Sequence, residues 1–113
     1  MTAIDAVRVV VEEECGPDLR ASDLVLVRSD DGEEWIALRA GRAAPSPDAP
    51  HGALDLAVVC RGEDRREQAQ RVPLDAVGQA AAGPFVAGGL VATFRFTVDG
   101  ERRLGVKVRA HRE

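Results

Sequence analysis

The strongest constraint in this sequence is the alternation of apolar and polar residues on both sides of the Asp-Gly pair near its C-terminus. Apolar residues recur at every second position, which is the period of a β-strand with one buried face. A three-residue loop over 98–100 or 99–101 keeps them all on one face, whereas a two-residue turn would mix the faces. The predicted inner face consists of Leu90, Ala92, Phe94, Phe96, Leu104, Val106 and Val108.

A second hairpin is predicted over residues 24–38, where the segment SDDGEE separates two apolar strands. Gly32 can take the left-handed conformation that a three-residue loop over 30–32 needs. With this loop Val27 faces Trp35, and both faces of the hairpin are apolar. One predicted face carries Leu24, Leu26, Ile36 and Leu38, and the other carries Val25, Val27, Trp35 and Ala37. The cover of the second face is the main question that the sequence raises.

A third hairpin follows, with an alternating strand over 54–61 and a polar segment over 65–72. We predict that the polar segment is a solvent-facing edge strand, because a charged edge opposes the addition of further strands. A short helix is the competing interpretation of the same segment.

Two helices are also predicted, over 2–15 and over 74–83, because glycine and proline follow or end each segment. The stripe formed by Ile4, Val7 and Val11 would lie on the core. A strand over 7–11 is the alternative, since valines lose rotamer freedom in a helix and three glutamates crowd the predicted helix C-terminus.

Together these elements predict an α+β fold in which the N-terminal helix packs on an antiparallel sheet of about six strands, arranged as three hairpins, with a short second helix. The length of 113 residues predicts a single domain, 1–113. Residues 41–52 hold three prolines and two glycines and are predicted to form a mobile Pro/Ala-rich loop.

Composition and charge narrow the classes of function. The formal net charge of −4 argues against indiscriminate binding of nucleic acid. No apolar run approaches the ~20 residues of a membrane span. The N-terminus lacks the basic start and the cleavage site of a secretory signal, so a cytoplasmic location is expected. Cys15 and Cys60 are then expected to be reduced.

The sequence contains no motif that predicts catalysis, a cofactor or a metal site. His51 lies in the proline-rich segment and His111 lies near the C-terminus, so no predicted element fixes either imidazole. The HxH, HExxH, CxxC, GxSxG and GxxxxGK[ST] patterns do not occur. We therefore predict a non-catalytic role, without a cofactor or a metal.

Two surfaces remain as candidate binding sites. The predicted helix can cover only one face of the first hairpin, and an exposed apolar face with a tryptophan is typical of a protein contact. This interface is predicted to consist of Val25, Val27, Trp35 and Ala37. The outer face of the C-terminal hairpin collects four cations without an acid. These cations are Arg95, Arg103, Lys107 and Arg109.

The first surface predicts a small cytosolic interaction module that self-associates as a dimer or binds a protein partner. The second surface predicts, as the alternative, a binder of an anionic ligand, an acidic partner or nucleic acid. Nucleic acid is the least favoured of these partners, because single-strand binding needs exposed aromatic side chains.

Overall fold

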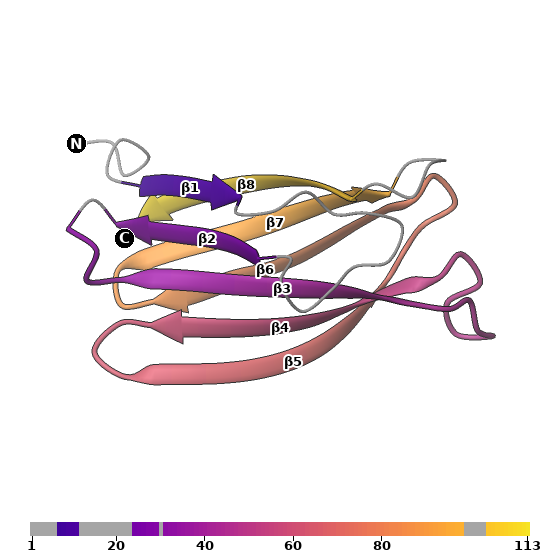
Figure 1. Ribbon diagram of the computed structural model, residues 1–113, viewed down its shortest axis with the longest axis horizontal. Helices are drawn as coiled ribbons and strands as arrows, with labels where there is room; N and C mark the ends of the chain where they lie inside the picture. Colours follow the sequence, from indigo (N-terminus) through magenta and orange to yellow (C-terminus); the bar gives the residue numbers. More distant parts are fainter. Residues whose placement is uncertain (1–6, 12–23, 30, 99–103) are drawn as a thin grey trace.

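The computed structural model describes residues 7–11, 24–29, 31–98 and 104–113 (Figure 1). Eight antiparallel strands form within these residues. They are β1 (Val7–Val11), β2 (Leu24–Ser29), β3 (Trp35–Ala43), β4 (Ala53–Arg61), β5 (Arg65–Pro73), β6 (Gln79–Ala87), β7 (Leu90–Val98) and β8 (Leu104–Arg112). The first five strands make one sheet, in the order β1-β2-β3-β4-β5, and the last three make a second sheet, in the order β6-β7-β8.

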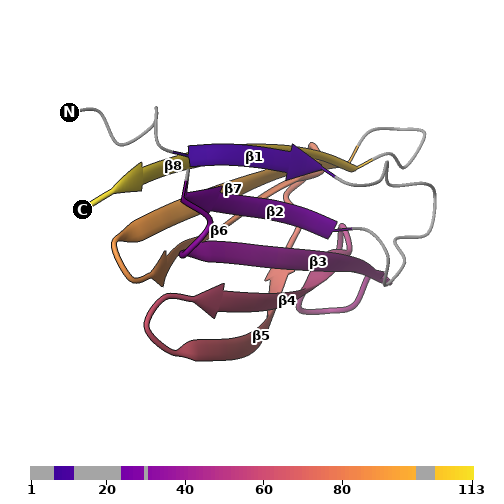
Figure 2. The same ribbon diagram turned by 60° about the vertical axis from the view of Figure 1, so that its left-hand side comes forward.

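The two sheets lie face to face as the layers of a sandwich (Figures 1 and 2). Both views place β1 beside β8, so that the first and last strands close one side of the sandwich. Residues 74–78 carry the chain from β5 to β6 and thus from one layer to the other. Strand alternation then gives each sheet one inner face, and the two inner faces form the core.

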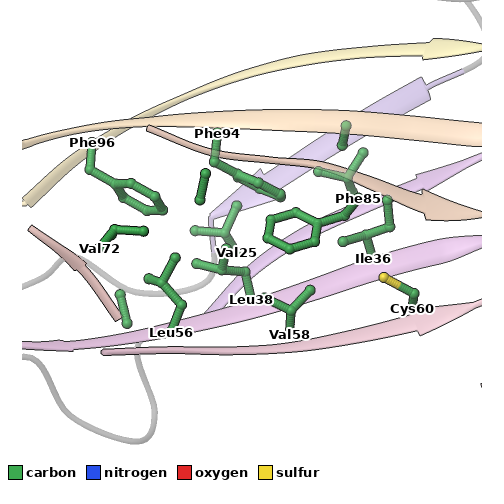
Figure 3. Close-up of a cluster of buried hydrophobic side chains, with 14 of the residues drawn as sticks. Val25, Ile36, Leu38, Leu56, Val58, Cys60, Val72, Phe85, Phe94 and Phe96 are labelled. Carbon is green, nitrogen blue, oxygen red and sulfur yellow. The ribbon is translucent and has the colours of Figure 1, made fainter. Parts of the chain in front are cut away.

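The core fills the space between the sheets (Figure 3). Phe94 is fully buried at its centre, with ring centroids 5.9 Å from Phe85 and 6.4 Å from Phe96. The large sheet meets these rings with Val27, Ile36, Leu38, Leu54, Leu56 and Val58, each no more than 2% exposed. Three aromatic rings from the small sheet therefore take the place that the sequence assigned to a helix.

The α+β prediction is wrong, because the described residues contain no helix. Residues 7–11 form β1, which pairs with β2 in the register Val9↔Val27. This is the strand that the run of valines offered as an alternative, and β-branched residues fit a pleated sheet better than a helix. The remainder of the predicted helix 2–15 lies outside the described residues.

The predicted second helix, 74–83, is also wrong. A turn occupies its first half, where Asp75 Oδ1 accepts hydrogen bonds from the backbone N–H groups of Val77 at 3.0 Å and Gln79 at 2.9 Å. Strand β6 begins at Gln79 and pairs with β7. An irregularity in the register between Ala82 and Phe85 shifts the buried positions of β6 from even to odd numbers, which conceals the strand period in the sequence.

The three predicted hairpins are confirmed as β2–β3, β4–β5 and β7–β8. In the last hairpin Phe94 stands opposite Val108 and Phe96 opposite Val106, with the predicted apolar residues on the core side. The last described pair of this hairpin is Val98 with Leu104, and the predicted three-residue loop falls largely on residues 99–103, outside the described residues. The alternation of residues 54–61 is confirmed, since Leu54, Leu56, Val58 and Cys60 are all buried.

The polar segment 65–72 is confirmed as an edge strand. It lies within β5, which among the described strands pairs only with β4, at the edge of the large sheet. Its first seven residues, 65–71, are exposed on both faces, and Val72 is the first to enter the core.

The proline-rich segment is shorter than predicted, because β3 continues through residues 41–43 and pairs there with 53–55. The connection between β3 and β4 has its own hydrogen bonds. Ser46 and Ala49 exchange backbone N–H···O bonds of 3.0 Å in each direction, and Ala49 is only 5% exposed. The predicted mobility of this segment stays a prediction.

Candidate binding surfaces

The pairing of β2 with β3 differs from the prediction by one residue. Val27 faces Ile36, and Arg28 faces Trp35. The turn determines this register, because the Ser29 N–H donates to the Glu34 carbonyl at 2.9 Å and the Ser29 hydroxyl lies 2.6 Å from Asp31 Oδ1. A shift of one residue between paired strands changes which side chains share a face.

The four residues of the predicted interface therefore separate. Val25 and Val27 belong to the core, with 5% and 0% of their surface exposed. Trp35 and Ala37 lie on the opposite face of the large sheet and are partly exposed. The structure brings only the second pair together on an accessible surface.

Trp35 lies in a row of arginines that crosses the large sheet. Arg28 on β2 and Arg61 on β4 are its direct neighbours, and Arg65 on β5 follows Arg61. Directly opposite residues in an antiparallel sheet have Cβ atoms about 5 Å apart, so neighbouring side chains in this row are within reach of one another. Arg28 and Arg61 are exposed, whereas Trp35 is half-buried between them.

An apolar row adjoins the arginine row on the same face. It consists of Leu26, Ala37 and Val59, which are cross-strand neighbours and are partly exposed. We call the combined surface the Trp35 face and define it by Leu26, Arg28, Trp35, Ala37, Arg39, Val59 and Arg61. Sequence reasoning missed its arginines, although Arg39 shares the strand phase of Trp35 and Arg61 shares that of exposed Asp55.

The cations of the Trp35 face have no acidic partner within the described residues. By contrast, Arg71 at the far end of the same face is paired, with its Nε 2.6 Å and its Nη2 3.0 Å from the two carboxylate oxygens of Asp55. The hydrogen bond from Arg71 holds the pKa of the Asp55 carboxyl below its usual value. Arg28 and Arg61 therefore flank Trp35 as cations without an acidic partner among the described residues, and Arg39 lies four residues further along β3 on the same face.

A second positive surface lies on the outer face of the small sheet. Arg95, Lys107 and Arg109 are exposed there, as the sequence predicts, and none of them has an acidic partner within the described residues. Arg95 and Lys107 are direct cross-strand neighbours, and Arg109 stands opposite Thr93. The fourth predicted cation, Arg103, lies outside the described residues.

One end of the sandwich is closed by a cluster of turns that the sequence analysis did not identify. Glu34 Oε2 accepts a hydrogen bond of 2.8 Å from the N–H of Gly89, in the β6–β7 turn. Its Oε1 forms an ion pair of 2.8 Å with Arg112 Nη1, without the alignment of a hydrogen bond. Gly62, in the β4–β5 turn, lies so close to the backbone of Gly88 that no Cβ fits there. The cluster joins three turns and has an architectural role.

Cys60 borders an open depression of about 440 Å³ at this end of the molecule. Its side chain is buried and unpaired. Burial raises the pKa of the Cys60 thiol, which lowers its reactivity as a nucleophile. Cys15 lies outside the described residues. His51 and His111 are both exposed. In the described ranges, no three side chains of His, Cys, Asp or Glu are grouped as a metal site requires.

Comparison with known proteins gives no match: no family model, no curated protein and no solved structure corresponds to this chain. Over the part of the chain that the structure describes, no helix has the length and apolar character needed to cross a membrane. The two positive faces of the sandwich are the candidate binding sites of the described residues.

Proposed function

We propose that this chain is a non-catalytic protein-interaction module that binds an acidic partner through the Trp35 face. The observation that supports the proposal is the half-buried Trp35 between two exposed arginines, next to an apolar row that has no cover among the described residues. Tryptophan and arginine are the residues most enriched among those that dominate binding energy in protein interfaces. The partner would place an apolar side chain on the row formed by Leu26, Ala37 and Val59, and carboxylates on the arginines.

The sequence predicts self-association through this surface, but the charge of the surface favours an acidic partner over a second copy of this chain. In a symmetric dimer that buries this face, each copy contributes its own Arg28, Arg39 and Arg61 to one interface. Like charges across an interface are unfavourable, and desolvation makes the repulsion stronger. An acidic partner instead pairs with these arginines, and bidentate pairs of arginine and carboxylate are especially favourable.

A protein partner is also favoured over nucleic acid. The chain is acidic overall, with an isoelectric point near 5.2, and Trp35 is its only tryptophan. Stacking along a single strand needs several aromatic side chains in series, whereas one aromatic anchor within a partly apolar patch is typical of protein contacts. We further propose a cytoplasmic location, where the buried free thiol of Cys60 stays reduced.

The test is a selection of short peptides displayed on phage against the folded wild-type protein. We expect the selected peptides to combine aspartate or glutamate with an apolar residue, because both features of the face must be matched. Binding of a synthetic copy is then measured by fluorescence anisotropy. Arg61→Glu and Trp35→Ala should each weaken it by about tenfold or more, which corresponds to ~1.4 kcal/mol.

Matched controls lie elsewhere on the surface. Lys107→Glu changes a cation on the opposite sheet, and Val77→Ala removes an apolar side chain that is 71% exposed outside this face. Neither should alter binding of the peptide. Selected peptides without an acidic bias, or peptides whose binding survives Arg61→Glu, would refute the proposal. A wild-type dimer that Trp35→Glu dissociates in sedimentation velocity experiments would assign the face to self-association instead.

A further inference from the structure

The outer face of the small sheet has a feature independent of the Trp35 face. An open depression of about 310 Å³ lies over β6, β7 and β8 and reaches the turn before β6. We call it the Arg95 depression and define it by six of its lining residues: Asp75, Gln79, Ala81, Arg95, Thr97 and Lys107. The small side chain of Ala81, directly opposite Arg95 in the register, leaves the space above the sheet open.

Two like charges meet on the floor of the depression. Arg95 and Lys107 stand directly opposite each other on β7 and β8. Like charges in this position destabilise a sheet, because their Cβ atoms are only about 5 Å apart. Arg109 adds a third cation two residues along β8, and none of the three has an acidic partner among the described residues. A bound anion would relieve the repulsion.

Two neutral residues that line the depression, Gln79 and Thr97, carry hydrogen-bond donors. Thr97 stands opposite Gln79, so a hydroxyl and a carboxamide border the guanidinium of Arg95 and the ammonium of Lys107. From this arrangement we infer that the Arg95 depression binds the phosphate group of a small ligand. A carboxylate offsets one charge with two oxygens, whereas a phosphate dianion offsets two charges and accepts hydrogen bonds at three or more oxygens.

One acidic side chain lies at the rim. Asp75 lines the depression, but its Oδ1 accepts the N–H groups of Val77 and Gln79 and so holds the turn before β6. Its negative charge opposes a bound phosphate. Asp75→Asn leaves an oxygen that can accept the same bonds and removes the charge, so it should strengthen binding.

The test is a titration of the ¹⁵N-labelled protein with sodium pyrophosphate at low ionic strength, followed by NMR. We expect saturable shifts of the backbone amides around Arg95 and Lys107 and no saturable shifts on the large sheet. The double substitution Arg95→Gln with Lys107→Gln should weaken binding by at least about tenfold, because it removes both charged donors. Asp75→Asn should strengthen it by a few fold. Inorganic phosphate should compete with pyrophosphate at the same residues.

The matched control is Arg39→Gln with Arg61→Gln, which removes two cations from the Trp35 face and should leave pyrophosphate binding unchanged. If the first double variant does not fold, Lys107→Gln alone should still weaken binding by several fold. Shifts that merely follow ionic strength, or equal binding by wild type and the Arg95/Lys107 variants, would overturn the inference. So would a single-stranded oligonucleotide that binds these residues over a hundred times more tightly than pyrophosphate. None of these results bears on binding through the Trp35 face, because that face belongs to the other sheet.

Discussion

Gly88→Ala is the most informative single change for the architecture. Gly88 has a φ of +62°, and a Cβ built there would collide with Glu34 Oε2. The same carboxylate oxygen accepts the 2.8 Å hydrogen bond of Gly89. Alanine at 88 therefore carries the cost of the left-handed conformation and also displaces Glu34 from the cluster of turns.

Gly32→Ala is the matched control, because Gly32 has a φ of +76° but open space around its would-be Cβ. Conformational strain alone should cost about 1 kcal/mol at either position. Loss of a partly buried hydrogen bond to a carboxylate adds about 1–3 kcal/mol at Gly88. We expect Gly88→Ala to lower the free energy of unfolding by about 2–4 kcal/mol, out of a total of 5–15 kcal/mol that is usual for domains.

Urea unfolding, followed by far-UV circular dichroism and by the fluorescence of Trp35, measures both costs. A double-mutant cycle identifies the cause. In a Glu34→Ala background the collision is absent, so Gly88→Ala should cost no more than Gly32→Ala. The role of the Glu34 contact would be refuted if the two glycine substitutions cost the same stability in the wild-type background. It would also be refuted if Gly88→Ala still cost more than Gly32→Ala, by the same amount, in the Glu34→Ala background.

Three further outcomes are expected. Phe94→Ala should cost about 3–5 kcal/mol in urea unfolding, because the ring is fully buried between the sheets, whereas Val77→Ala at an exposed position should change stability by less than about 0.5 kcal/mol. Arg71 holds the pKa of the Asp55 carboxyl below its usual 3.8. The pair therefore contributes to stability above that pH and loses its contribution as the pH falls through the lowered pKa of the folded state. The substitution Arg71→Gln should return the Asp55 pKa towards 3.8, as measured by an NMR titration of the carboxyl group. Cys60 should resist alkylation in the native state and react fully in urea, because it is buried and unpaired, and an intact mass two hydrogens light under non-reducing conditions would contradict this.

Strand alternation was the most reliable guide where it occurs. It identified the strand over 54–61 and the inner residues of the C-terminal hairpin, because a half-buried strand needs no distant information to show its period. It also placed Arg95, Lys107 and Arg109 on an outer face. The first hairpin was identified from its turn residues, and the edge strand over 65–72 from its continuous polarity. The helix predictions failed where the period was ambiguous. Over 7–11 the segment VRVVV, with four valines in five residues, satisfies either period, and in β6 the irregularity between Ala82 and Phe85 interrupts the alternation.

The Trp35 face was predicted only in part from the sequence. Both strands of the first hairpin are apolar in both phases, so their composition allows either register. The hydrogen bonds between Ser29 and Glu34 in the turn select one register. In this register Val25 and Val27 lie on the core face. The row of Arg28, Trp35 and Arg61 then forms from three strands, and no segment of the sequence contains it.

By itself the sequence determined the local features: where strands turn back, which side of an alternating strand is buried, and which cations stay in solvent. These follow from the two-residue period and from turn chemistry within a few neighbouring residues. Only the tertiary structure decided that a second sheet, and not a helix, covers the first sheet, and which residues stand side by side across the strands. The physical reason is that apolar burial is non-directional. An apolar face specifies that it must be covered, whereas packing of the whole chain decides what covers it.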